Sequence, residues 1–127
     1  MKVEHLALQV ADPVKMAKWY VEHLQMQVVR KGGKPSYGRF LADLTGRVIL
    51  EIYHNPNYPV PDYASQPAAQ LHLAFAVSDI DVVHANLVAA GAKPEGQIEE
   101  IAAGDRIAVV RDPWGLAVQL VKRAKAL

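Results

Sequence analysis

Apolar and polar residues alternate in several short stretches of the chain, and two longer stretches have helical periodicity. Residues 2–10 alternate strictly, with Leu6, Leu8 and Val10 on one side and His5, Ala7 and Gln9 on the other, which predicts a half-buried strand. Asp12 and Pro13 then form a helix start, with Asp as N-cap and Pro at the first helical position. We expect this helix to end near Leu24.

The expected helix has an apolar face, and the rest of the first half alternates as strands do. The helix should bury four aliphatic residues, with aromatic residues at the flanks of that face: Val14, Ala17, Val21 and Leu24, flanked by Trp19 and Tyr20. Three strands are predicted after it, over residues 26–30, 37–43 and 47–54. The first half therefore has the order βαβββ.

The second half repeats this order. Residues 70–77 predict a strand, Asp79 caps a helix that runs to about Ala90, and Gly91 ends it. Strands follow over residues 98–102, 106–111 and 116–122, and residues 123–127 form a short basic tail. We expect a single domain over residues 1–127, with one module over about 1–54, a Pro-rich loop or linker over 55–69 and a second module over about 70–122.

A repeated octapeptide supports the duplication. The segment HLALQVAD begins at His5, and HLAFAVSD begins at His72, 67 residues later. A repeat once per half is typical of two copies of one supersecondary unit. The fold class we predict is α+β, built from two βαβββ modules.

Strand parity selects four polar side chains as a candidate site. His5 and His72 lie on the faces with small residues, and Glu51 and Gln119 lie opposite the bulky aliphatic residues of their strands. Two histidines and one carboxylate suit a first-row divalent metal ion, and the amide oxygen of Gln119 is a weaker fourth ligand.

Each of these residues also has a simpler interpretation. A single histidine in a strand is more often structural than a ligand, and the Glu51 carboxylate could be paired with Arg39 or Arg106 without any metal. The other histidines, His23, His54 and His84, have no repeat partner. Four aromatic residues could line a substrate site, although packing is the safer interpretation: Tyr53, Tyr58, Tyr63 and Trp114.

Composition narrows the classes of function. The chain has 14 Lys and Arg against 13 Asp and Glu and no cysteine, so nucleic-acid binding, disulfides and thiolate metal sites are not expected. It has no apolar run of the roughly 20 residues that a membrane span needs. It begins in a strand pattern rather than a signal peptide. We expect a cytoplasmic protein that does not bind membranes.

The sequence resembles the vicinal oxygen chelate superfamily, the group of glyoxalases, bleomycin-resistance proteins and extradiol dioxygenases. The resemblance covers the whole chain and rests on HLALQVADPVKMAKWYVEHLQM, RVILEIYH, QLHLAFAVSDID with AAGAKP, and RDPWGLAVQL. It implies an open mixed β-barrel of two modules around a central cleft, a homodimer, and a divalent ion (Zn, Ni, Mn or Fe). The implied ligands are His5, Glu51, His72 and Gln119.

Two positions depart from the family pattern. Gln25 stands where the family usually has Gly, and Gln119 stands where the last ligand is usually Glu. An amide cannot act as a base at neutral pH, so a standard glyoxalase I is not expected.

The resemblance leaves several functions open. The first is a metalloenzyme of lyase or isomerase type, acting on a small substrate with vicinal oxygens and with Glu51 as base. Tyr53 and Trp114 would contact that substrate. The alternatives are a metal-free ligand-sequestering protein of the bleomycin-resistance type, an extradiol-dioxygenase-like protein, and a structural module without chemistry.

Overall fold

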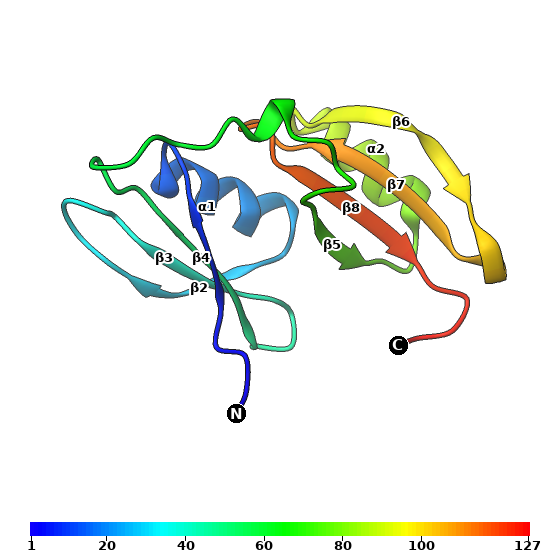
Figure 1. Cartoon of the computed structure of the whole chain (residues 1–127). Helices are drawn as coiled ribbons and strands as arrows, with labels where there is room; N and C mark the ends of the chain where they lie inside the picture. Colours follow the sequence, from blue (N-terminus) through cyan, green and yellow to red (C-terminus); the bar gives the residue numbers. More distant parts are fainter. The chain divides into compact units, whose positions relative to one another are not determined.

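A computed structural model describes residues 1–127 and divides them into two compact units, Met1–Pro61 and Asp62–Leu127. Each unit contains one helix and one four-stranded sheet (Figure 1). The first unit contains β1 Leu6–Gln9, α1 Pro13–His23, β2 Gln27–Lys31, β3 Arg39–Ala42 and β4 Val48–Tyr53. The second contains β5 Leu73–Ala76, α2 Ile80–Ala89, β6 Lys93–Glu100, β7 Arg106–Arg111 and β8 Ala117–Lys122, with 3₁₀ turns at Tyr63–Ser65 and Ala102–Gly104.

The two sheets have the same topology. Their strand orders are β1-β4-β3-β2 and β5-β8-β7-β6, and in each the first strand pairs in parallel with the last strand of the unit. The other neighbours are antiparallel. The predicted α+β fold of two βαβββ modules is therefore confirmed.

The helix boundaries follow the sequence signals. The Asp12 carboxylate accepts a hydrogen bond from the Lys15 amide at 3.0 Å, and Asp79 accepts one from the Val82 amide at 3.1 Å. Both aspartates thus satisfy amide groups that a first helical turn leaves unpaired. Gly91 follows α2 with φ +102°, a conformation that favours glycine.

The buried face of α1 differs from the expected one. Val14 and Val21 are 46% and 41% exposed, whereas Met16, Ala17 and Tyr20 are buried, as are Pro13 and Trp19. The helix has two overlapping apolar stripes that share Ala17, and periodicity alone does not say which one faces the sheet. The expectation that Val14 and Val21 are buried was wrong.

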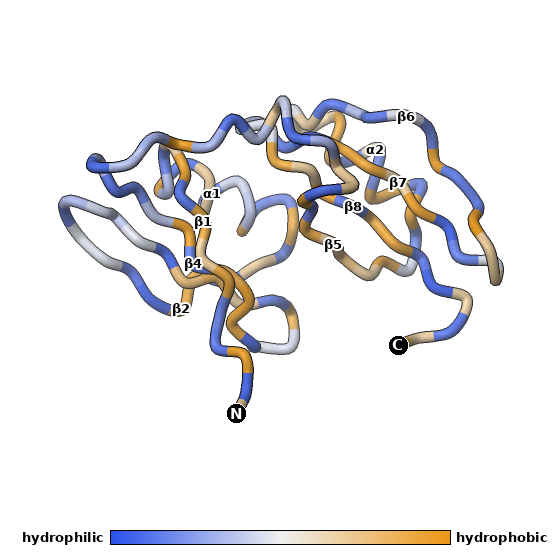
Figure 2. Tube along the Cα trace, in the orientation of Figure 1, coloured by the Kyte–Doolittle hydropathy of each residue, from blue (hydrophilic) through white to orange (hydrophobic).

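Each unit has its own apolar core between helix and sheet. Fully buried side chains of the first unit include Met16, Tyr20, Leu41, Leu50 and Ile52, and those of the second include Ile80, Leu87, Val110, Val118 and Leu120. Figure 2 shows an apolar stretch along β7, which contributes Ala108 and Val110 to the second of these cores.

Strand β6 is longer than expected. The sequence predicted a strand over residues 98–102, but β6 covers Lys93–Glu100 and its register shifts between Glu95 and Glu99. Gly96, with φ +75°, lies in this irregular stretch, where an interrupted alternation hides the strand from periodicity. No helix has the length and apolar character needed to span a membrane.

Candidate functional site: two polar pairs

The first unit brings His5 and Glu51 together. The parallel pairing of β1 and β4 places Ala7 directly opposite Glu51, and His5 lies two residues before Ala7 on the same face. His5 Nε2 is 3.2 Å from Glu51 Oε2, and the two side chains are 28% and 26% exposed. The strand register therefore creates a half-buried imidazole–carboxylate pair.

Neighbouring groups fix the orientation of the His5 ring. Its Nδ1 contacts the carboxylate of Glu4, which leaves Nε2 directed at Glu51. Phe40, which lies opposite Glu51 in the β3–β4 register, meets the imidazole edge-on with 5.2 Å between ring centroids. A histidine held through Nδ1 presents its other nitrogen in a defined direction, as metal-ligating histidines do.

Glycine allows the main chain before β3 to approach Glu51. Gly38 is buried, and a Cβ atom at this position would lie 3.7 Å from Glu51 Oε1 and 3.9 Å from Tyr53 Cβ. The carboxylate thus lies between the ring of His5 and the main chain at Gly38.

The two arginines considered as partners of Glu51 are engaged by other groups. Nη1 of Arg39 donates to the carbonyl oxygens of Gly32, Tyr37 and Gly38. Arg106 forms an ion pair with Asp81 at 2.7 Å in the second unit. The side chain that contacts the Glu51 carboxylate is His5.

The second unit contains a related pair. Gln119 lies directly opposite Ala74 in the β5–β8 register, and His72 lies two residues before Ala74 on the same face. His72 Nδ1 is 2.7 Å from the Ala68 carbonyl oxygen, so Nδ1 carries the proton and donates it. The lone pair of a neutral His72 ring is then on Nε2, the nitrogen available to a metal ion. His72 is exposed and Gln119 is half-buried.

The distance in the first pair suits a divalent ion. Two donors bound to one ion at about 2.1 Å lie roughly 3.0–3.4 Å apart in octahedral to tetrahedral geometry. The 3.2 Å between His5 Nε2 and Glu51 Oε2 falls within that interval. Neither unit by itself contains a group of three His, Asp or Glu side chains that could hold a metal ion. Each unit therefore offers two of the predicted donors.

Gln9 has a structural role next to this face that sequence reasoning missed. Its Nε2 donates to the carbonyl oxygens of Asn55 and Tyr58 at 2.7 and 2.9 Å, and its Oε1 accepts from the Asn55 amide at 2.7 Å. The signal was present, because Gln9 shares the strand face of His5 and Ala7. Gln9 fastens the start of the Pro-rich segment to the end of β1.

The aromatic candidates lie in different environments. Tyr53 follows Glu51 by two residues in β4 and shares its face, whereas Tyr58 is 68% exposed. Tyr63 is buried and belongs to the packing of the second unit. Trp114 is half-buried in the turn between β7 and β8.

The remaining three histidines have other surroundings. His54 Nδ1 is 3.0 Å from the Val10 carbonyl oxygen, which ties β4 to the end of β1. His23 contacts the Trp19 ring with 5.2 Å between centroids. His84 was expected on the surface of its helix, but its Nε2 is buried without a hydrogen-bond partner.

The chain is similar to known proteins along nearly its whole length. A sequence model described as "Glyoxalase/Bleomycin resistance protein/Dioxygenase superfamily" matches residues 2–120. A lactoylglutathione lyase of Haemophilus influenzae is 29% identical over 126 residues, which cover 96% of this chain and 93% of that protein.

Solved structures share the fold. A glyoxalase family protein from Enterococcus faecalis has a TM-score of 0.72 and 27% identity, covering 95% of this chain and 97% of that one. An E144Q mutant of glyoxalase I from Zea mays has a TM-score of 0.76 and 25% identity, covering 98% of this chain and 46% of the maize chain.

Proposed function

The chain belongs to the glyoxalase/bleomycin resistance protein/dioxygenase superfamily, and on that premise we propose that it is a divalent-metal-dependent enzyme. Its substrate would be a small molecule with vicinal oxygens, and its reaction a lyase- or isomerase-type proton transfer. The metal donors would be His5 and Glu51 from one module and His72 and Gln119 from the other. The proposal applies equally whether the two modules around each ion belong to one chain or to two.

The observation that carries this proposal is the 3.2 Å approach of His5 Nε2 to Glu51 Oε2. A ring held by Glu4 through Nδ1 and a carboxylate packed against Gly38 form a preorganised pair of donors. In the other unit, the carbonyl of Ala68 directs His72 in the same manner, through Nδ1. Both histidines are therefore suited to bind through Nε2.

The chain's own side chains then have distinct tasks. A divalent ion at these donors would supply Lewis-acid stabilisation of negative charge on the substrate oxygens. Glu51, the only carboxylate among the four donors, would remove a proton from the substrate carbon next to the carbonyl and return it to the neighbouring carbon. Gln119 can bind through its amide oxygen but cannot accept that proton. Tyr53, on the face of Glu51, would contact the substrate, and we assign the same role to Trp114.

We do not assign a standard glyoxalase I reaction, because the amide of Gln119 cannot act as a base at neutral pH. One anionic donor replaces the two that the family pattern would supply. We therefore propose a substrate whose proton transfer needs a single carboxylate base.

Metal content tests the proposal. The protein would be purified without chelators, supplied with Zn²⁺, Ni²⁺, Mn²⁺ or Fe²⁺, and its bound metal measured by mass spectrometry. We expect about one ion per pair of modules in the wild type, and a loss of at least about tenfold in affinity for Glu51→Ala and for His72→Ala, because each change removes a strong ligand.

The matched control is His23→Ala, which removes a histidine from the surface of α1 and should leave the metal content unchanged. A wild-type protein that binds none of the four ions would contradict the proposal and favour a metal-free ligand-sequestering protein of the bleomycin-resistance type. Bound iron with ring-opening activity on a catechol would instead favour an extradiol-dioxygenase-like enzyme.

We also propose that the protein forms a homodimer. Large apolar side chains are exposed on both units, among them Leu6, Val29 and Val82. Light scattering after size-exclusion chromatography tests this proposal, and a mass of one chain at all concentrations would contradict it.

A further inference from the structure

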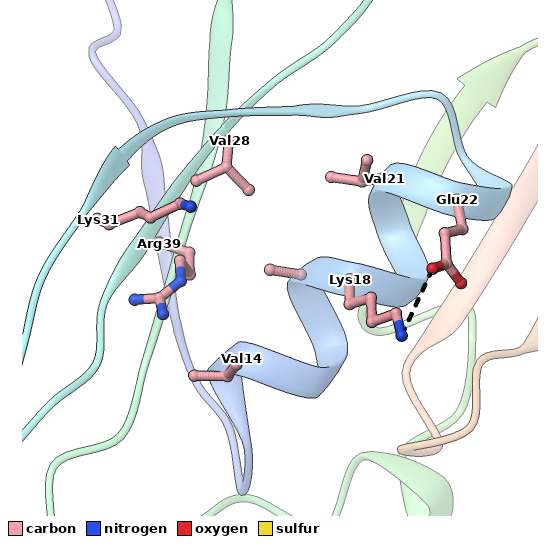
Figure 3. Close-up of a pocket in the computed structure, with 8 residues that line it drawn as sticks. Val14, Lys18, Val21, Glu22, Val28, Lys31 and Arg39 are labelled. Carbon is pink, nitrogen blue, oxygen red and sulfur yellow. Dashed lines mark ion pairs between the residues drawn. The ribbon is translucent and has the colours of Figure 1, made fainter.

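A groove in the first unit lies between α1 and the strands β2 and β3 (Figure 3). Its volume is about 400 Å³, which is within the size range of small-molecule sites. Its lining residues come from three elements: Val14, Ala17, Lys18, Val21 and Glu22 from α1, Val28 and Lys31 from β2, and Arg39 from β3. Three cationic side chains and one carboxylate, that of Glu22, therefore line the groove beside an aliphatic wall.

A β-bulge places Lys31 in this groove. Val28 pairs with Leu41 and Lys31 pairs with Arg39, so the two β2 residues share a face although they are three residues apart. The register shift between Val28 and Arg30 accounts for this odd spacing. Without the bulge, strict alternation would direct Lys31 to the opposite face.

Lys31 and Arg39 are like charges placed directly opposite each other. Such a cross-strand pair is destabilising when nothing neutralises it. No carboxylate lies within ion-pair distance of either residue, and the contacts of Arg39 are to main-chain carbonyls. Glu22 is engaged by Lys18 at 3.8 Å. The two cations thus lack an anionic partner.

The helix side of the groove has an accessible apolar strip beside the Lys18–Glu22 ion pair. Val14 and Val21 are 46% and 41% exposed and lie seven residues apart, about 10 Å along the helix axis. Ala17 lies between them and is buried. In Figure 3 the side chains of Val21 and Val28 face each other across the groove. This surface suits a short hydrocarbon chain.

We propose that this groove binds a small aliphatic carboxylate. The carboxylate group would lie between Lys31 and Arg39, where it neutralises the opposed cations, and the hydrocarbon chain would pack against Val14, Val21 and Val28. The positive charges of Lys31 and Arg39 favour an anionic ligand. The valine side chains favour a ligand with a hydrocarbon tail over an inorganic anion.

This site is distinct from the His5–Glu51 pair. Arg39 pairs with Ile52 and shares the buried, helix-facing side of the sheet, whereas Phe40 and Glu51 share the opposite side. The inference therefore does not depend on metal binding or on the proposed reaction.

Methyl NMR with hexanoate as the probe tests the proposal on the full-length protein without added metal. We expect saturable shifts of the Val14, Val21 and Val28 methyl groups at hexanoate concentrations up to about 10 mM. Hexylammonium should give none, because Lys31 and Arg39 would repel its ammonium group and the Glu22 carboxylate is already paired with Lys18. Affinity should rise about two- to fourfold per methylene from butanoate to hexanoate.

Lys31→Glu is the decisive variant. It should weaken hexanoate binding at least about tenfold, because it replaces a cation that faces the carboxylate by an anion. Glu opposite Arg39 would form a cross-strand ion pair, so the Tm should not fall and the loss would not reflect unfolding. The matched control is Arg30→Glu, the same reversal one residue away on the other face, which should bind hexanoate like the wild type.

Three results would overturn the proposal. The first is the absence of methyl shifts with hexanoate, and the second is equal weakening by Arg30→Glu. The third is a dependence of the Val14 and Val21 resonances on protein concentration without hexanoate, because that would identify a second copy of the chain as the occupant.

Discussion

Two residues at equivalent positions, Glu51 and Gln119, give the two halves of the protein different chemistry. Each lies directly opposite an alanine that follows the histidine of its unit by two residues, and the two sheets have the same topology. Glu51 carries a charge and can exchange a proton, whereas Gln119 offers an amide oxygen and an amide donor. The difference in proton chemistry between the two pairs comes from this single position.

Gln119→Glu should give the protein a glyoxalase-type activity. A carboxylate at this position adds a general base, which contributes about 10²-fold or more to proton transfer. The measurement is the conversion of the methylglyoxal–glutathione adduct by the metal-loaded protein, followed by absorbance. Gln119→Ala is the matched control and should stay inactive. Strong activity in the wild type would mean that Glu51 suffices as base.

At the scale of elements, the same turn occurs twice with different surroundings. Asp43–Gly46 and Asp112–Gly115 each have a main-chain hydrogen bond from the glycine amide to the aspartate carbonyl, at 3.0 and 2.9 Å. Gly46 has φ +79°, and a Cβ atom there would meet no other atom within 4 Å, whereas Gly115 has φ +90° and lies against Ala64. The turn before β8 is therefore closely covered by the 3₁₀ turn at Tyr63–Ser65.

Arg111 strengthens this contact. Its Nη1 donates to the carbonyl oxygens of Tyr63 and Gly115 at 3.1 and 3.3 Å, and Glu95 pairs with the same guanidinium. The side chain of Tyr63, the first residue of the 3₁₀ turn, is buried. The 3₁₀ turn at Tyr63–Ser65 is thus part of the packing of the second unit.

Gly115→Ala should destabilise the protein more than Gly46→Ala. Both changes place a Cβ at positive φ, which costs about 1–2 kcal/mol. At Gly115 the new Cβ would also lie 2.7 Å from Ala64 Cβ, so the main chain must move. We expect a loss of about 3 kcal/mol in unfolding free energy for Gly115→Ala and about 1 kcal/mol for Gly46→Ala, measured in urea. Equal losses would show that the close approach does not persist in solution.

At the scale of the whole molecule, four aspartates make stability depend on pH. Hydrogen bonds from the Lys15 amide and from Thr45 lower the pKa of Asp12 and of Asp43, respectively, below the usual value near 3.8. Arg106 lowers the pKa of Asp81, and Arg123 lowers that of Asp105. The contact between Arg123 and Asp105 also fastens the start of the basic tail.

The Tm should fall as the pH is lowered from 5 to 2 (about the range set by carboxyl groups). A lowered folded-state pKa means that the unfolded chain binds protons first, so this stabilisation is complete above the usual pKa near 3.8 and is lost as the pH falls through the folded pKa. Asp81→Asn should lower the Tm at pH 7 and make the loss in acid smaller. An unchanged acid profile in this variant would contradict the assignment.

The sequence by itself determined the order of elements and which strand face each candidate donor occupies. Strand alternation has a fixed period of two, so the parity of His5, Glu51, His72 and Gln119 could be read directly. The caps at Asp12 and Asp79 were equally local, because the residues that form them are neighbours in the chain.

Only the tertiary structure decided which residues meet. The stripe of α1 that faces the sheet, the histidine partner of Glu51 and the Gln9 contacts to Asn55 and Tyr58 all depend on packing between distant segments. The bulge that turns Lys31 toward Arg39 breaks the periodicity on which sequence reasoning relies. Local patterns fix a face of each element, whereas long-range packing fixes what that face touches.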